Sequence, residues 1–328
     1  MPLLLSDRAA TVSPVPLVTT DEARSFGIRI RSSSFIRIRP GIYANRAAFE
    51  KLGRWERYVV RVHAFARAHP DVPLCLESAA VVHGLPVFDE TRDIHVHSAE
   101  RPKSRRFGDV AVHTSANPRD FERRGGILVT SLMDTVTDLG RILPPARALA
   151  VFDAAISASQ GGGLDLAALR GHGADQVTSR GSARLRWLWD HADGRAESPA
   201  ESVSRAVIEW CGFPEPTLQQ VFRYEGEEDR VDFYFPSVGV IGEADGWGKY
   251  QLTEPEKAAA NLRSEKRRED RLRRHGHPFG RWDLADAWRV TPLQKALAAA
   301  GVPLARPADR LMLATLRDFR RDVPRDQG

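Results

Sequence analysis

Three carboxylates gather in one short stretch of the chain. Residues Arg230–Tyr250 read RVDFYFPSVGVIGEADGWGKY, with Asp232 near the start, Glu243 and Asp245 near the middle and Lys249 close to the end. Carboxylates that lie close together repel one another, and a common reason for bringing them together is a hard divalent cation, which prefers oxygen ligands. These residue types therefore predict a site for such a cation.

Two strands joined by a tight turn would position these side chains. Val231, Phe233 and Phe235 alternate with polar residues and would share one face of a strand, which leaves Asp232 on the other face. Pro236 and Ser237 predict a break, and Val238–Ile241 begins a second apolar strand that leads into Glu243 and Asp245 on one face. The hairpin would bring the three carboxylates to one edge, with the ammonium group of Lys249 nearby.

The pattern of Asp232 followed by Glu243-x-Asp245 resembles the PD-(D/E)XK nuclease superfamily. It is more closely similar to the small endonuclease-like domain related to very-short-patch-repair endonucleases. The neighbouring stretches that extend the resemblance over roughly residues 183–288 are Ala196–Arg205, Gly212–Gln220, Ser264–His277 and Arg281–Asp286. Asp245 occupies the place of the superfamily's lysine, so Lys249 or Lys266 is the candidate to serve instead.

This resemblance implies an αβββαβ domain that cleaves DNA with Mg²⁺ or Mn²⁺. Ser198-Pro199 begins a helix, and the acidic residue that the family places on this helix corresponds to Glu201. The alternative is that Glu201 only stabilises the start of its own helix. The implied metal ligands are Asp232, Glu243 and Glu201, the implied catalytic set adds Asp245, Lys249 and Lys266, and Gln219 or Gln220 would position water or DNA.

The N-terminal residues alternate isoleucine with arginine after a short helix that begins near Thr20. A Pro40-Gly41 turn then leads into Ile42-Tyr43. This arrangement resembles the degenerate winged-helix domain of abortive-infection type IV antitoxins, which implies DNA and a cognate toxin as partners. The arginines either contact phosphate or decorate the solvent face of a hairpin, and they are Arg29, Arg31, Arg37 and Arg39.

Residues Leu74–Phe88 and Val129–Arg141 resemble the segment that follows the wing in the same antitoxin-like proteins. His95 and His97 would project from one strand face at a spacing that suits a metal, with His83 and His113 as further candidates. A half-exposed strand that carries two histidines is the alternative. Asp134 and Asp138 lie one helical turn apart and are interpreted as solvated or helix-supporting residues.

Pro255–Arg274 predicts a strongly charged helix. Between Arg263 and Arg274 the sequence has seven basic residues and three acidic ones. The helix is either self-paired, through Glu269 with Arg273 and Asp270 with Arg274, or a DNA-binding face. The basic residues assigned to DNA on the second interpretation are Arg263, Arg267, Arg271 and Arg274.

Length and composition agree with a protein of several domains. The chain has 328 residues, a net charge of +5 and two cysteines, which suits a polyanionic partner and gives no disulfide framework. No apolar stretch is long enough to span a bilayer, so we expect a cytoplasmic protein without a membrane partner. The expected organisation is α/β (α+β overall), with a winged-helix-like domain over 1–70, a mixed α/β region over 71–160, a linker over 161–182, the endonuclease-like domain over 183–289 and a helical tail over 290–328.

These patterns support two functions. One is a DNA-binding protein with a metal-dependent endonuclease domain, acting in phage defence or a toxin–antitoxin setting. The other is a non-cleaving DNA-binding antitoxin or transcriptional regulator that retains the nuclease fold as a scaffold.

Overall fold

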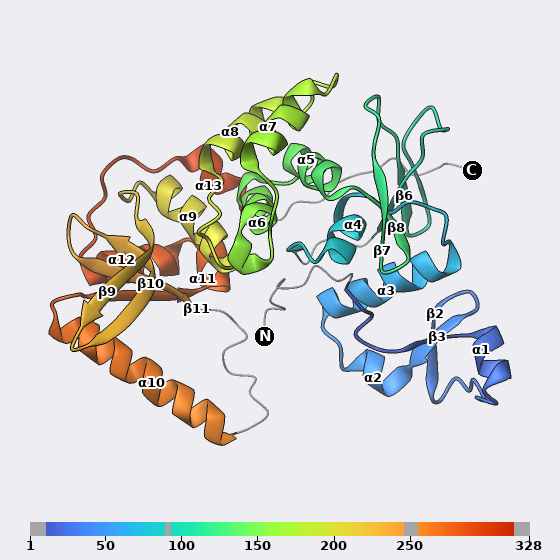
Figure 1. Cartoon of the computed structure of the whole chain (residues 1–328), viewed down its shortest axis with the longest axis horizontal. Helices are drawn as coiled ribbons and strands as arrows, with labels where there is room; N and C mark the ends of the chain where they lie inside the picture. The colour runs from blue at the N-terminus through green and yellow to red at the C-terminus, as the bar shows by residue number, and fades with distance from the viewer. Residues whose placement is uncertain (1–10, 89–92, 246–254, 318–328) are drawn as a thin grey trace. The chain divides into compact units, whose positions relative to one another are not determined.

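The computed structural model of the chain describes residues 11–88, 93–245 and 255–317, and the chain forms two compact units. The N-terminal unit contains residues 11–142 and Asp165–Arg186, and the C-terminal unit contains Leu143–Leu164 and Trp187–Arg317. Figure 1 shows α-helices and several small sheets along the chain, so the fold is mixed α/β. None of the helices described is both long and apolar enough to cross a membrane.

The N-terminal unit begins with a three-stranded antiparallel sheet. Strands β1 (Leu17–Thr19), β2 (Phe35–Arg39) and β3 (Ile42–Asn45) are arranged in the order β1-β3-β2. Helix α1 (Thr20–Ser25) begins at Thr20 as predicted, and a capping box between Thr19 and Glu22 satisfies its first turn. Helices α2 (Arg46–Glu50) and α3 (Arg54–Ala68) follow, and α3 packs against β2.

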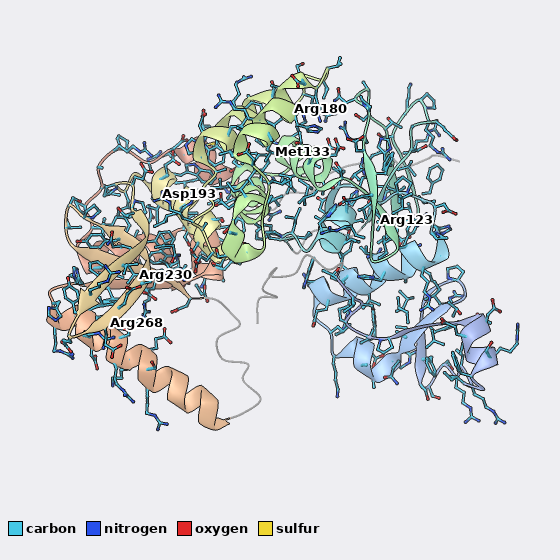
Figure 2. The ribbon with its side chains drawn as sticks, viewed as in Figure 1. Arg123, Met133, Arg180, Asp193, Arg230 and Arg268 are labelled. Atoms are coloured by element: carbon cyan, nitrogen blue, oxygen red, sulfur yellow. The ribbon has the colours of Figure 1, made fainter. Side chains whose placement is uncertain are left out.

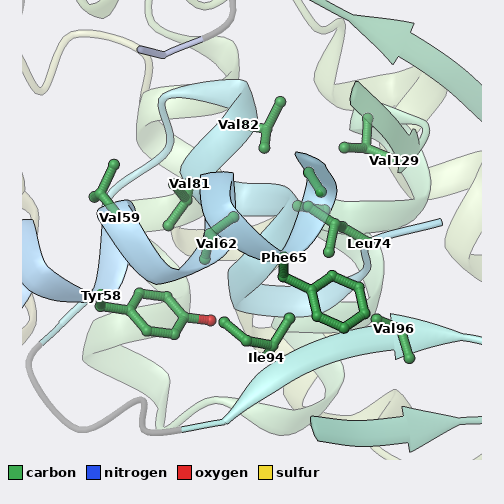
Figure 3. Packing of buried hydrophobic residues seen from close by; sticks show 12 residues of the cluster. Tyr58, Val59, Val62, Phe65, Leu74, Val81, Val82, Ile94, Val96 and Val129 are labelled. Carbon is green, nitrogen blue, oxygen red and sulfur yellow. The ribbon is translucent and has the colours of Figure 1, made fainter. Parts of the chain in front are cut away.

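The remaining elements of this unit surround a hydrophobic core. Strand β4 (Ile94–His97) pairs in parallel with β6 (Val110–His113), β5 (Arg105–Phe107) lies on the far side of β6, and β7 (Phe121–Arg124) forms a hairpin with β8 (Ile127–Thr130). Helix α4 (Leu76–His83) packs against β4 and against α5 (Leu132–Ile142). Figure 3 shows this core, in which apolar side chains of α3, α4, β4 and β8 meet, among them Phe65, Val82, Ile94 and Val129.

The C-terminal unit contains a four-stranded sheet in the order β12-β11-β10-β9. Strands β9 (Thr217–Tyr224), β10 (Glu227–Phe235) and β11 (Val240–Asp245) are antiparallel neighbours, and β12 (Phe279–Asp283) joins β11 in parallel. Helix α9 (Pro199–Cys211) precedes β9, and α10 (Pro255–Arg274) connects β11 to β12. The predicted strands, their break and helix 255–274 are therefore confirmed in position.

The two faces of this sheet are covered by different elements. On one face Phe233 stacks on Trp282, whose indole N–H donates to the hydroxyl of Ser204 at 2.7 Å, and α9 packs against β11. The other face meets α10, because Leu272 of that helix packs with Ile241. Val231, Phe233 and Phe235 are buried and Asp232 is half-buried. The predicted common face is not observed, because Val231 packs with Ile241 and Leu272 on the α10 side, whereas Phe233 stacks on Trp282. The side that faces α10 thus carries both an apolar cluster around Leu272 and Glu243, which binds Arg268.

Several helices complete the C-terminal unit. Helix α6 (Pro145–Ile156) packs on α9, and α11 (Leu284–Arg289), α12 (Thr291–Ala300) and α13 (Arg310–Ala314) follow β12. The range 161–182, predicted as a linker, contains α7 (Leu166–Asp175), which belongs to the N-terminal unit, and α8 (Ser182–His191) begins in that unit and ends in the C-terminal one. Asp165 caps α7 and Leu169 is fully buried, so a short local pattern suffices to form a helix in this glycine-rich stretch.

Candidate functional site

Strands β10 and β11 bring the three carboxylates to the same end of the sheet. The backbone N–H of Ala244 donates to the carboxylate of Asp232 at 2.9 Å, which fixes Asp232 beside the two acidic residues that flank Ala244. Glu243 is only 2% exposed. Its Oε1 atom is buried and has no hydrogen-bond partner among the described residues. Burying such an acceptor without a partner costs free energy, so this oxygen is suited to a ligand.

Arginines, which the sequence analysis had not assigned to this site, lie among the carboxylates. Arg268 of α10 donates to Glu243 at 2.8 Å and to the carbonyl oxygen of Arg230 at 2.8 Å. Arg230 in turn binds Glu197 through two hydrogen bonds of 2.7 and 2.8 Å. Figure 2 shows Arg230 and Arg268 in the same part of the C-terminal unit. A continuous chain of hydrogen bonds therefore runs from Glu197, just before α9, to Glu243.

Arg281 forms the second positive centre. It is paired in register with Glu243 on the neighbouring parallel strand. Its guanidinium lies 4.0 Å from Glu243, 3.8 Å from Asp245, 3.2 Å from Glu265 and 3.3 Å from Glu269. Burial lowers the pKa of Arg281, but the surrounding carboxylates, Asp245 first, outweigh this effect and raise the pKa above its usual value. Arg281 thus stays charged and offsets the negative charge of the cluster.

Glu201 lies at the start of α9, where the resemblance places an acidic residue. It is 5% exposed and accepts hydrogen bonds from the backbone N–H of Glu197 at 2.9 Å, the hydroxyl of Ser198 at 2.8 Å and the side-chain amide of Gln219 at 2.8 Å. Burial raises the pKa of Glu201, and the nearby charge of Glu197 adds to the rise, although the hydrogen bonds oppose it. The contacts tie Glu201 to its own helix start and to β9, where Gln219 adopts a φ of +54°.

In the described part of the chain, Lys266 and Gln220 are not found bound to the carboxylates of this site. Lys266 is exposed on α10, and Lys249 lies outside the described residues. Gln220 donates to the carbonyl oxygen of Val221 at 2.8 Å, so it is bound within its own strand. Within residues 11–88, 93–245 and 255–317 no group of three or more His, Cys, Asp or Glu side chains is arranged to hold a metal ion. The carboxylates of the sheet are instead interleaved with guanidinium groups.

The basic residues of α10 divide into two sets. Arg263 and Arg267 are exposed, as a DNA-binding face requires. Arg271, however, binds Asp229 through two hydrogen bonds of 2.7 and 2.8 Å. Arg274 pairs with Glu225 at 2.8 Å instead of with Asp270 as predicted, because the turn between β9 and β10 brings Glu225 within reach. The predicted pair of Glu269 with Arg273 is confirmed at 2.8 Å.

The N-terminal arginines also differ from one another. Arg29, Arg31 and Arg37 are exposed. Arg39 was predicted to contact phosphate with them, but its side chain is only 12% exposed and pairs with Asp109 at 2.8 Å. It also lies over the ring of Phe65, 4.9 Å from the centroid. The bulge between Arg37 and Arg39 accounts for the difference, because it breaks the strict alternation of β2.

Three of the four candidate histidines, His83, His95 and His113, are bonded to protein groups, whereas the buried ring nitrogens of His97 have no hydrogen-bond partner among the described residues. Ring nitrogens of His95 and His113 lie 2.8 Å apart, and His95 is 3.7 Å from Glu77. His83 hydrogen-bonds the carbonyl oxygen of Thr130 at 2.9 Å. His97 is 9% exposed, so β4 is buried rather than half-exposed.

Asp134 and Asp138 were predicted to be solvated or helix-supporting. Asp134 is 1% exposed and accepts from the hydroxyl of Ser131 at 2.8 Å and from the backbone N–H of Asp120 at 2.9 Å. Asp138 accepts two hydrogen bonds of 2.7 and 2.9 Å from Arg119. Both carboxylates are therefore paired rather than solvated, and Asp134 supports the start of α5.

Two proteins of Mycobacterium tuberculosis are similar to this chain. They are uncharacterized protein MT2308 of strain CDC 1551 / Oshkosh and uncharacterized protein Rv2248 of strain ATCC 25618 / H37Rv. Each is 27% identical over 294 residues, which cover 88% of this chain and 97% of the relative. No protein-family model matches the chain, and no solved structure matches it.

Proposed function

We propose that the C-terminal unit is a PD-(D/E)XK-like domain that hydrolyses DNA phosphodiesters with Mg²⁺ or Mn²⁺. The order α9-β9-β10-β11-α10-β12 supports this proposal, because it is the αβββαβ order that the resemblance implies. The observation that carries the proposal is the position of Asp232, bound to the N–H of Ala244 beside the buried Oε1 of Glu243, which has no hydrogen-bond partner in the described part of the chain. Hard oxygen donors of this kind suit a divalent cation.

Asp232 and Glu243 would hold the ion, and Glu201 would support the site from α9. The ion would supply a water of lowered pKa and would polarise the phosphate. The residues of the chain would orient the phosphate and offset its charge. The exposed Arg263 and Arg267 on α10 offer contacts for the DNA backbone beside the site.

The proposal extends to the N-terminal half. Arg29, Arg31 and Arg37 are exposed around the β2–β3 hairpin, which suits a wing that contacts phosphate without reading sequence. Together with the antitoxin-like resemblance, this arrangement supports a cytoplasmic DNA-binding protein in phage defence or a toxin–antitoxin pair, with a cognate toxin as its protein partner.

Plasmid nicking by the purified full-length chain tests the enzymatic proposal. We expect wild type to nick supercoiled DNA in Mg²⁺ or Mn²⁺ and not in EDTA, and Asp232→Asn and Glu243→Gln to have no detectable activity. The matched control is Glu228→Gln, which removes an exposed carboxylate of the same sheet that pairs with Arg223. Nicking by Glu243→Gln at the wild-type rate would show that this site is not the active site.

A metal-dependent melting temperature gives a second readout that needs no DNA. A ligand that binds only the folded state stabilises it by mass action. We expect Mn²⁺ to raise the melting temperature of wild type and of Glu228→Gln, and to leave that of Glu243→Gln unchanged. An equal response of wild type and Glu243→Gln would argue against a metal at this position.

One observation favours a non-cleaving regulator as the second candidate. Arg268 and Arg281 already neutralise the carboxylates, and Asp245 stands where the superfamily has lysine. Such a network can stabilise a scaffold without chemistry. On this interpretation wild type binds DNA, nicks none in any metal, and retains its DNA affinity in Asp232→Asn and Glu243→Gln.

A further inference from the structure

Arg281 is held loosely although it is surrounded by acceptors. Its closest carboxylate contact is 3.2 Å, to Glu265, and the other three lie between 3.3 and 4.0 Å. Its Nε atom is buried and lacks a hydrogen-bond partner among the described residues. By contrast, Arg268 bonds Glu243 at 2.8 Å. A guanidinium has five donors in a fixed plane, and those of Arg281 are poorly satisfied by the carboxylates around it.

A phosphate would satisfy this guanidinium better than its present partners do. Arginine binds phosphate through two parallel N–H···O bonds, which are shorter and stronger than the contacts of Arg281. The side chain is 29% exposed, so a ligand from solvent can reach it. Its strand neighbour is Glu243, so a phosphate bound here would lie beside the proposed metal ligand.

The charge of the cluster also links the two ligands. In the free protein Arg281 offsets the charge of Glu243 and Asp245. A divalent cation held by Asp232 and Glu243 would take over part of that task and would repel the guanidinium, which then needs a new anion. Binding of the cation and binding of a phosphate should therefore strengthen each other, by the same factor in both directions.

We propose that Arg281 is the phosphate-binding cation of this site and serves where the resembled superfamily uses the lysine that Asp245 replaces. This inference rests on the proposed function. Hydrolysis forms a bond from water oxygen to phosphorus and breaks a phosphorus–oxygen ester bond. The water loses a proton to solvent and the leaving alkoxide takes one from solvent. Arg281 transfers no proton and stabilises the negative charge on the phosphate oxygens.

Cleavage rates of full-length variants give the first test. We expect Arg281→Gln to slow plasmid nicking by about 10²–10³-fold, the cost of losing one donor to a developing negative charge, and Arg281→Lys to recover part of the rate. The control is Arg223→Gln, which removes an exposed arginine of the same sheet. Circular dichroism and melting temperatures establish that each variant is folded. Active wild type with equally active Arg281→Gln would overturn the inference and leave the proposed function intact.

Mn²⁺ binding gives a test that needs no cleavage. Free Mn²⁺ is measured by electron paramagnetic resonance with and without excess dimethyl phosphate, a phosphodiester without bases. In wild type and Arg223→Gln we expect the diester to tighten Mn²⁺ binding by about 5-fold or more. In Arg281→Gln we expect no coupling, with Mn²⁺ alone bound at least as tightly as by wild type. Absence of coupling in wild type, or its persistence in Arg281→Gln, would overturn the inference, even if no protein nicks DNA and the proposed function fails.

Discussion

Two arginine–carboxylate networks, one in each unit, differ in how fully their groups are bonded. In the N-terminal unit the side chain of Arg119 is 4% exposed. It donates to both oxygens of Asp138 and to the carbonyl oxygens of Asn117 and Pro118. In the C-terminal unit Arg281 faces four carboxylates at longer range, and both its Nε and Oε1 of Glu243 lack partners among the described residues.

This difference separates a structural ion pair from a ligand site. A buried ion pair is tolerated when its hydrogen bonds are complete, and it then has no reason to change partners. In a network with unsatisfied buried donors and acceptors, the free-energy cost of burying these groups remains, and a ligand that bonds to them can remove it. The open network around Glu243, rather than the closed one around Arg119, is therefore where binding is expected.

The largest effect should come from breaking the closed network. Arg119→Gln leaves the carboxylate of Asp138, which is 17% exposed, without its counter-ion, which should reduce the free energy of unfolding by about 3 kcal/mol. Arg281→Gln should cost about 1 kcal/mol or less, because its contacts are long and partly solvated. Urea unfolding measures both. If Arg281→Gln lost more free energy of unfolding than Arg119→Gln, the network around Arg281 would be the structural one.

The pH dependence of a third ion pair, Asp153 with Arg205, sharpens the comparison. Burial raises the pKa of Asp153 from 3.8 to about 6, although the charge of Arg205 opposes the rise. The folded state therefore binds more protons than the unfolded state between these values, and this contribution to stability is lost as the pH rises through 6.

Asp153→Asn cannot titrate, so its stability relative to wild type should increase by about 2 kcal/mol from pH 4 to pH 6, given the pKa values of 3.8 and about 6. Urea unfolding of both proteins across this range is the measurement. A constant difference between them would mean that Asp153 ionises normally in the folded state.

The third prediction compares the exposed arginines of the two units. Replacing Arg263 and Arg267 by Gln should reduce the salt dependence of duplex binding by about two phosphate contacts, with little sequence preference. The matched variant replaces Arg29 and Arg37 of the N-terminal unit. Fluorescence anisotropy over a range of salt measures both slopes. Unchanged slopes in both variants would exclude these surfaces as the DNA contacts.

The smallest effect concerns neighbours on one strand. Arg39→Gln should reduce the free energy of unfolding by about 1 kcal/mol, because it loses Asp109 and its contact with Phe65. Arg37→Gln should stay within about 0.5 kcal/mol of wild type, since that side chain is exposed. Equal effects in unfolding experiments would show that the packing of Arg39 contributes little.

Much of the framework around the site followed from local patterns. Alternation predicted the strand β10, Ser198-Pro199 predicted the start of α9, and the bounds of Pro255–Arg274 agree with the helix. These features depend on residues close in sequence, through strand alternation, capping and helical periodicity. The sequence could therefore place Asp232, Glu243 and Asp245 at one end of a hairpin.

The partners of those charges depended on the tertiary structure. Arg281 meets Glu243 because β12 returns in parallel beside β11 after a whole helix, and Arg274 reaches Glu225 because a turn lies next to the end of α10. Arg39 is mostly buried because a bulge and a distant aspartate turn it inward. Sequence alone determined which groups are charged and where strands and helices run; only the fold decided which charges neutralise each other, since ion pairing acts through space between residues far apart in the chain.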